Sequence, residues 1–183
     1  MTGAAVTGGG RAAAGPAVVL VGPMGVGKST VGALLARRLG AAYRDTDQDV
    51  AAETGLTVAE LFAREGEAGF REREHRAVVR AVAEPGAVLS LGGGAVLHSG
   101  TRALLTGLPV VFLDVSAEVA LRRVGDGRTR PLLAADPDRR WRELRDRRRP
   151  LYSAVARVVV PTDDRTPEEV ADAVLDALEP ETP

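Results

Sequence analysis

The sequence predicts an α/β fold of three layers, in which helices cover both faces of a central five-stranded parallel sheet. The chain has 183 residues, a length that suits one domain with a substantial core. Short apolar segments rich in Val and Leu suit strands that are buried on both faces. Segments with helical periodicity alternate with these strands, and that alternation implies parallel strands joined by right-handed crossovers.

The expected strands are short and lie at residues 17–22, 41–44, 88–91, 110–113 and 158–160. The expected helices lie at residues 28–39, 57–66, 70–83, 116–124, 138–152 and 167–178. Thr57 and Glu60 have the spacing of a capping box, and Thr166 precedes a proline at the first helical position. Ligands of such a sheet bind at the carboxyl ends of the strands, so site residues are expected there.

A phosphate-binding loop is predicted between the first strand and the first helix. Residues 22–29 are Gly-Pro-Met-Gly-Val-Gly-Lys-Ser and fit the pattern G-x-x-x-x-G-K-[ST]. The glycines let the backbone wrap closely, so that its amides and the helix N-terminus face phosphate oxygens. Lys28, the only lysine in the chain, then reaches the β- and γ-phosphates, and the Ser29 hydroxyl serves Mg²⁺.

Two aspartates, Asp45 and Asp47, follow the second expected strand. A helix of about 12 residues carries the chain about 18 Å from the phosphate loop, and the return strand brings it back to the same edge. Asp45 can hold Mg²⁺ there, directly or through water. Asp47 is the candidate that orients the attacking hydroxyl and accepts its proton. The competing interpretation is a pair of turn or helix-cap aspartates, which the nearby phosphate loop disfavours.

Two arginines and a glycine triplet are candidates for binding a small carboxylate. Arg71 lies early on a helix, and Arg148 lies just before Pro150. Residues 92–94, all glycine, follow a buried strand, so their amides can form a small anion-binding nest. Guanidinium groups match carboxylates with two parallel hydrogen bonds. Either arginine taken alone is more typical of a solvated surface charge, so the prediction depends on the whole set.

The segment at about 125–138 contains Gly, Pro and Arg without periodicity, and we predict a mobile lid over the phosphates. Its Arg130 can neutralise charge that develops on the transferred group. The competing interpretation is an arm that binds RNA or DNA. An aromatic content of 3% and a net charge of -1 disfavour that interpretation, so no nucleic-acid partner is expected.

We expect one domain at residues 17–179, between flexible tails at residues 1–16 and 180–183. Its substrate-binding segment is expected at about 46–83. The chain has no cysteine, which excludes disulfides, thiolate catalysis and Cys-based zinc sites. No stretch is typical of a signal peptide or a membrane span, so we expect a cytoplasmic monomer without a membrane partner. Neither His75 nor His98 is assigned a role.

The combination of motifs resembles the shikimate kinase family, in the branch of P-loop proteins that is similar to nucleoside monophosphate kinases. The resemblance spans residues 18–178. It rests on the phosphate loop with Thr30, on Asp45-Thr46-Asp47, Phe70-Arg71-Glu72, Leu91-Gly92-Gly93-Gly94 and Arg130-Pro131-Leu132, and on the R-x-P-L-Y pattern that begins at Arg148. It implies a P-loop NTPase-type fold that uses ATP and Mg²⁺.

The resemblance also assigns residues to roles. It implies catalysis by Asp47, Lys28 and Arg130, and Mg²⁺ binding by Ser29 and Asp45, with Ser90 near the Mg²⁺ shell. It implies ATP binding by Gly25, Val26, Gly27, Lys28, Ser29, Thr30, Arg123, Arg130, Arg165 and Pro167. It implies substrate binding by Asp47, Arg71, Gly92, Gly93, Gly94 and Arg148. Arg148 is preferred to its neighbour Arg149 as the second arginine that binds the carboxylate. The sequence alone does not fix the helix register that would distinguish the two.

The implied reaction is transfer of the γ-phosphoryl group of ATP to the 3-hydroxyl of shikimate, which gives shikimate 3-phosphate and ADP for the biosynthesis of chorismate and the aromatic amino acids. One alternative is a kinase similar to gluconate kinase, which shares the phosphate loop and the general fold. The other motifs together argue against it. A second alternative is a nucleotide-binding regulator without catalysis, which a missing Lys28 or Asp47 would have favoured.

Overall fold

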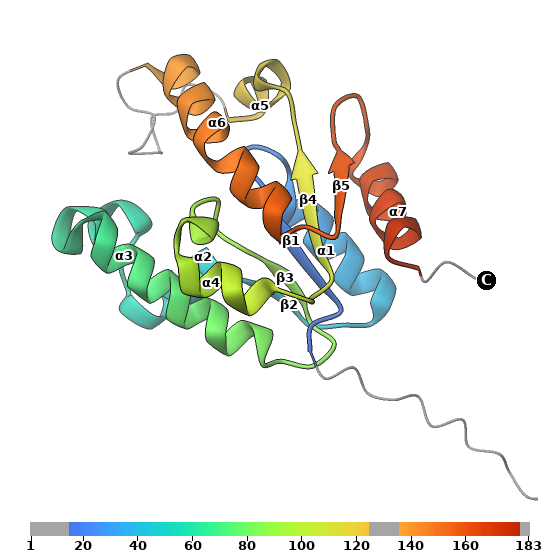
Figure 1. Cartoon of the computed structure of the whole chain (residues 1–183), viewed down its shortest axis with the longest axis horizontal. Helices are drawn as coiled ribbons and strands as arrows, with labels where there is room; N and C mark the ends of the chain where they lie inside the picture. The colour runs from blue at the N-terminus through green and yellow to red at the C-terminus, as the bar shows by residue number, and fades with distance from the viewer. Residues whose placement is uncertain (1–14, 125–135, 180–183) are drawn as a thin grey trace, which may run out of the picture.

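The computed structural model describes residues 15–124 and 136–179, which form a three-layer α/β fold (Figure 1). Five parallel strands form its sheet in the order β2-β3-β1-β4-β5, so the predicted fold class is confirmed. The strands are β1 (Val18–Val21), β2 (Tyr43–Asp45), β3 (Val88–Ser90), β4 (Val110–Asp114) and β5 (Val158–Pro161). Residues 1–14 and 180–183 of the expected tails, and residues 125–135 of the expected lid, lie outside the described residues.

Helices connect the strands and cover the sheet. They are α1 (Lys28–Leu39), α2 (Thr46–Thr54), α3 (Val58–Val82), α4 (Ser99–Leu105), α5 (Ala117–Val124), α6 (Pro137–Val155) and α7 (Pro167–Leu178), with a short 3₁₀ turn η1 (Ala95–Leu97). The predicted capping box is present at Thr57 with Glu60, and the predicted cap Thr166 also forms one with Glu169. None of the described helices is long and apolar enough to cross a membrane.

The central strand β1 is buried on both faces, as its composition predicts. Val18 and Leu20 belong to one hydrophobic core, which includes residues of α1 and α7. Val19 and Val21 belong to a second core with residues of α3, α4 and α6. Alternate side chains of a strand point to opposite faces, so the two cores are the two interfaces between the three layers.

The expected end of a helix near Gly66 is confirmed, because Gly66 (φ 72°, ψ 178°) has a non-helical backbone and divides α3 into two helical parts. Helix α4 was not predicted, because its N-cap is His98, whose Nδ1 accepts a bond from the Thr101 amide. Histidine is an unusual cap, so the start of α4 carries no clear sequence signal.

The register of the sheet gathers three strand ends at one edge. Leu20 of β1 pairs with Ser90 of β3, and Ser90 pairs with Asp45 of β2. The segments that follow these strands therefore emerge beside one another. They are the phosphate loop, the glycine triplet and the Asp45–Asp47 segment, and their meeting creates the candidate site.

Candidate active site

The phosphate loop between β1 and α1 has the backbone geometry that its glycines predict. A Cβ atom at Gly22 (φ 147°) would overlap the carbonyl oxygen of Leu113, so the loop passes too close to β4 for any side chain. Gly27 (φ 97°) is the N-cap of α1. The Lys28 ammonium donates to the carbonyls of Gly22 (2.8 Å) and Pro23 (3.1 Å), so it lies over the loop where phosphates are expected.

Ser29 and Asp45 form the pair of oxygens expected for Mg²⁺. The Ser29 hydroxyl lies 3.1 Å from Oδ2 of Asp45, across 16 residues of sequence. The other oxygen, Oδ1, accepts from the amides of Asp47 (3.0 Å) and Gln48 (3.4 Å) and so caps α2. Helix cap and metal ligand were competing interpretations of Asp45. Its Oδ1 caps the helix, while its Oδ2, which accepts from the hydroxyls of Ser29 and Tyr43 (3.4 Å), faces the proposed cation site.

Hard oxygen ligands fit Mg²⁺, which keeps several waters and takes one or two protein ligands beside substrate phosphates. Within residues 15–124 and 136–179, no group of three or more His, Cys, Asp or Glu side chains could hold a metal. The donor set therefore suits a metal that is shared with a nucleotide. Ser90, which was expected near the metal shell, is buried and donates to the Lys28 carbonyl (3.2 Å), where it anchors the first turn of α1.

Each residue of the glycine triplet abuts one predicted substrate-binding side chain. A Cβ atom at Gly92 would overlap the carboxylates of Asp47 and Glu74, and one at Gly94 would overlap the guanidinium of Arg71. A Cβ atom at Gly93 would lie 3.8 Å from Nη1 of Arg148 and 3.7 Å from the Met24 amide nitrogen of the phosphate loop. The missing side chains at Gly92 and Gly94 therefore let Asp47, Glu74 and Arg71 approach the triplet, whereas a Cβ atom at Gly93 would make only ordinary contacts.

The expectation that all three amides of the triplet are open to a ligand is wrong at Gly92. Its N–H donates to Oγ1 of Thr46 (3.1 Å), and both residues are buried. This bond fastens the start of α2 to the end of β3. It thereby sets the position of Asp47, the next residue along α2, so Gly92 acts on the site through spacing and not through its amide.

The structure separates the adjacent arginines Arg148 and Arg149. Arg148 is buried, and its Nη1 donates to the Gly93 carbonyl at 3.3 Å. Arg149 is exposed and binds Oδ2 of Asp114 through Nε (3.3 Å) and Nη2 (3.2 Å). Helix periodicity sends consecutive side chains in directions that differ by about 100°, so only one of the two reaches the glycine triplet.

Sequence reasoning missed a buried carboxyl group at the centre of this site. Glu74 is 1% exposed, and its Oε2 lies 2.5 Å from Nη1 of Arg71. Burial raises the pKa of Glu74 to about 7, against the opposing pull of Arg71, and the charge of Asp47 raises it further. Arg71 Nε and Glu74 Oε1 are buried without a hydrogen-bond partner. A bound ligand can therefore form hydrogen bonds with these two atoms.

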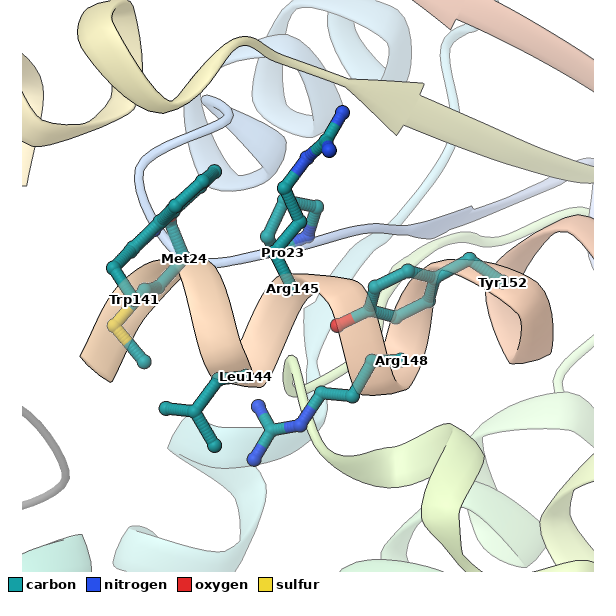
Figure 2. Close-up of a pocket in the computed structure, with 7 residues that line it drawn as sticks. All are labelled: Pro23, Met24, Trp141, Leu144, Arg145, Arg148 and Tyr152. Atoms are coloured by element: carbon teal, nitrogen blue, oxygen red, sulfur yellow. The ribbon is translucent and has the colours of Figure 1, made fainter. Parts of the chain in front are cut away.

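Two aromatic residues of α6 were also missed. The Tyr152 hydroxyl donates to the Gly93 carbonyl beside Arg148, and burial raises the pKa of Tyr152 to about 12, so the donor stays protonated. The indole N–H of Trp141 donates to the Met24 carbonyl at 3.1 Å. Figure 2 shows both side chains on α6 around a small pocket beside the phosphate loop. The only sequence signal of Trp141 was an aromatic residue in a basic helix, whereas Tyr152 is the last residue of the R-x-P-L-Y pattern but was assigned no role.

The residues expected near adenine lie at the far end of the sheet. Arg123, near the end of α5, donates to the carbonyl (3.1 Å) and hydroxyl (3.3 Å) oxygens of Thr162, which follows β5. Arg165 is exposed in the turn before α7, and Pro167 is the first residue of that helix. These segments form a surface on the β4–β5 side of the phosphate loop. Arg130 lies outside the described residues.

The fold and the site together define an ATP-dependent P-loop phosphotransferase that uses Mg²⁺. A model of the shikimate kinase family matches residues 24–179. The chain therefore belongs to the shikimate kinase family.

Individual relatives agree with this assignment. Shikimate kinase from Streptomyces avermitilis is 61% identical over 164 residues, which cover 90% of this chain and 96% of the relative. The solved shikimate kinase from Acinetobacter baumannii in complex with shikimate matches with a TM-score of 0.85 and 36% identity, over 88% of this chain and 91% of that one. A gluconokinase from Sinorhizobium meliloti 1021 matches with a TM-score of 0.62 but 21% identity, over 91% and 93% of the two chains, which is a likeness of fold alone.

Proposed function

We propose that this protein transfers the γ-phosphoryl group of ATP to the 3-hydroxyl group of shikimate, giving shikimate 3-phosphate and ADP. The convergence at the glycine triplet carries the proposal. Asp47, Arg71 and Arg148 each abut one of its residues, and Gly93 also abuts the phosphate loop. A small acid can thus present its carboxylate to two arginines and a hydroxyl to Asp47, within reach of the phosphates.

On the nucleotide side, the phosphate-loop backbone and the N-terminus of α1 supply amides for the phosphate oxygens. Lys28 places a positive charge among them, and its ammonium donates to the carbonyls of Gly22 and Pro23. Ser29 and Asp45 would hold Mg²⁺, which would supply neutralisation of the phosphate charge. By resemblance to the family, Arg130 adds a further positive charge at the transferred group.

On the acid side, Arg71 and Arg148 hold the carboxylate while Asp47 orients the 3-hydroxyl. As the bond between that oxygen and the γ-phosphorus forms, the bond from phosphorus to the ADP oxygen breaks, and Asp47 accepts the hydroxyl proton. Glu74 holds the guanidinium of Arg71. The proposed substrate-binding segment at about 46–83 consists of α2 and α3, which carry Asp47, Arg71 and Glu74.

The adenine is proposed to lie between Arg123 and the turn that carries Arg165 and Pro167. The two hydrogen bonds from Arg123 to Thr162 support this placement, because they fix its guanidinium plane beside the segment that follows β5. A planar guanidinium held in this way can stack on a heterocyclic base.

We further propose that the protein acts as a cytoplasmic monomer without nucleic-acid or membrane partners. Several arginines of α6 are already paired within the chain: Arg139 and Arg140 contact Glu143, and Arg145 and Arg149 contact Asp114. Such internal pairing leaves less positive charge for a polyanion. Light scattering on the purified protein would test the oligomeric state.

The decisive experiment is a coupled assay of ADP release with shikimate and gluconate side by side. We expect turnover with shikimate and none above background with gluconate. Preferential turnover of gluconate would contradict the proposed substrate. Nucleotide binding without turnover of either acid would instead favour the regulator interpretation.

A further inference from the structure

Helix α6 holds both loops of the site from one face. Trp141, Arg148 and Tyr152 are spaced by seven and four residues, so their side chains lie along one side of the helix. Trp141 reaches the Met24 carbonyl of the phosphate loop, while Arg148 and Tyr152 reach the Gly93 carbonyl of the glycine triplet. Figure 2 shows Trp141 against Met24 at one end of this row and Tyr152 at the other.

The contact between Trp141 and Met24 is long-range, and its donor side chain is buried while Met24 is half-buried. It joins residues 117 positions apart in the sequence, with an indole nitrogen to carbonyl oxygen distance of 3.1 Å. Trp141 is 1% exposed and belongs to the core that also contains Val26 of the phosphate loop. A hydrogen bond in such surroundings holds its acceptor firmly, because leaving a buried indole N–H unpaired is costly.

Fixing the Met24 carbonyl also fixes the next amide. The carbonyl of Met24 and the N–H of Gly25 belong to one planar trans peptide group, in which they point in opposite directions. When the carbonyl is directed at α6, the Gly25 N–H must point away from α6. Gly25 lies inside the phosphate-binding pattern, so its amide is among those assigned to the nucleotide phosphates.

We propose that Trp141 is a positioning residue for phosphoryl transfer, whose indole N–H orients the Met24–Gly25 peptide group so that the Gly25 amide faces the nucleotide phosphates. This inference rests on the proposed function only for the identity of the reaction. Its structural part concerns nucleotide binding and can be tested without the second substrate.

The first test compares Trp141→Phe with the wild-type protein in calorimetric titrations with ADP and Mg²⁺. Phenylalanine keeps an apolar ring and removes the donor, so we expect ADP to bind about fivefold more weakly, the effect of one ordinary hydrogen bond. Shikimate binding, measured without nucleotide, should stay within about twofold, because Arg148 and Tyr152 retain their contacts. Unchanged ADP affinity with lowered thermal stability would overturn the proposal and leave Trp141 a packing residue.

Leu144→Ala is the matched control. Leu144 lies one turn along α6, lines the same pocket and packs against the same core. We expect this variant to lose thermal stability but to bind ADP within about twofold of wild type. If it weakens ADP as much as Trp141→Phe does, general loosening of α6 explains the effect and the proposal is wrong.

A second measurement uses the wild-type protein and so does not depend on a variant that folds. Trp141 is the only tryptophan in the chain, so its indole N–H gives a single resonance in a ¹⁵N-labelled sample. We expect ADP with Mg²⁺ to shift this resonance and to slow its hydrogen exchange at least threefold. A resonance that does not respond to saturating ADP would contradict a link between the indole and the nucleotide site.

Discussion

The guanidinium of Arg71 lies 2.5 Å from the carboxyl of Glu74, three residues further along α3, and both side chains are buried. Removing two charges from water is costly, and their attraction offsets that cost only in part. The same arginine faces Gly94, at the position proposed for the substrate carboxylate. Glu74 thus keeps the arginine oriented and partly neutralised before the acid arrives.

The first prediction concerns pH and stability. The pKa of Glu74 is about 7 in the folded protein against an ordinary value of 4.5, so the folded state binds this proton more tightly. The contribution of protonated Glu74 to the free energy of unfolding is fully present below about pH 4.5 and is lost as the pH rises to about 7. Chemical denaturation should show that Glu74→Gln lacks this component, which amounts to about 3 kcal/mol across the window. Identical pH profiles for variant and wild type would contradict the assignment.

The second prediction tests Asp47 as the proton acceptor. Asp47→Asn keeps the size of the side chain that abuts Gly92 but removes its basicity. We expect kcat to fall by about 10² to 10⁴, the usual contribution of general base catalysis, while ATP affinity stays close to wild type. Asp49→Asn, on the same helix and paired with Arg44, should retain kcat within about twofold. Near-normal turnover by Asp47→Asn would reject the proposed role.

The third prediction distinguishes the two neighbouring arginines of α6. Arg148→Lys loses the forked donor geometry at the Gly93 side of the site, so we expect the KM for shikimate to rise about tenfold. Arg149→Lys changes an exposed group that pairs with Asp114, and its steady-state kinetics should stay near wild type. The opposite ranking in a steady-state assay would mean that Arg149 binds the carboxylate.

The fourth prediction concerns the capping box at the start of α3. The Thr57 hydroxyl accepts from the Glu60 amide (3.2 Å), and Glu60 accepts from the Thr57 amide (2.8 Å). Thr57→Ala should lower stability by about 1 kcal/mol, which corresponds to a fall in Tm of about 2–4 °C. Thr57→Ser keeps the hydroxyl and should melt near wild type. Equal losses in the two variants would show that the methyl group, and not the cap, matters.

Local sequence patterns sufficed to predict those structural features whose physical cause lies in neighbouring residues. The spacing Thr57 to Glu60 and the proline after Thr166 marked two helix starts, and the glycine-rich run from Gly22 predicted the phosphate loop. Alternation of strands and helices then sufficed for the three-layer parallel fold, because right-handed crossovers leave few other arrangements. The break of α3 at Gly66 was also expected, but the short helix α4 escaped, because a histidine cap is rarely used.

The sequence by itself determined the chemistry available to this protein: a phosphate loop, two aspartates near it, and arginines that can bind an acid. Only the tertiary structure decided which of these groups meet. Glu74 became a partner of Arg71 at the centre of the site, Arg148 turned inward while Arg149 turned outward, and Trp141 reached Met24 across 117 residues. Such contacts depend on how helices are rotated and packed on the sheet, and no local pattern of residues encodes that rotation.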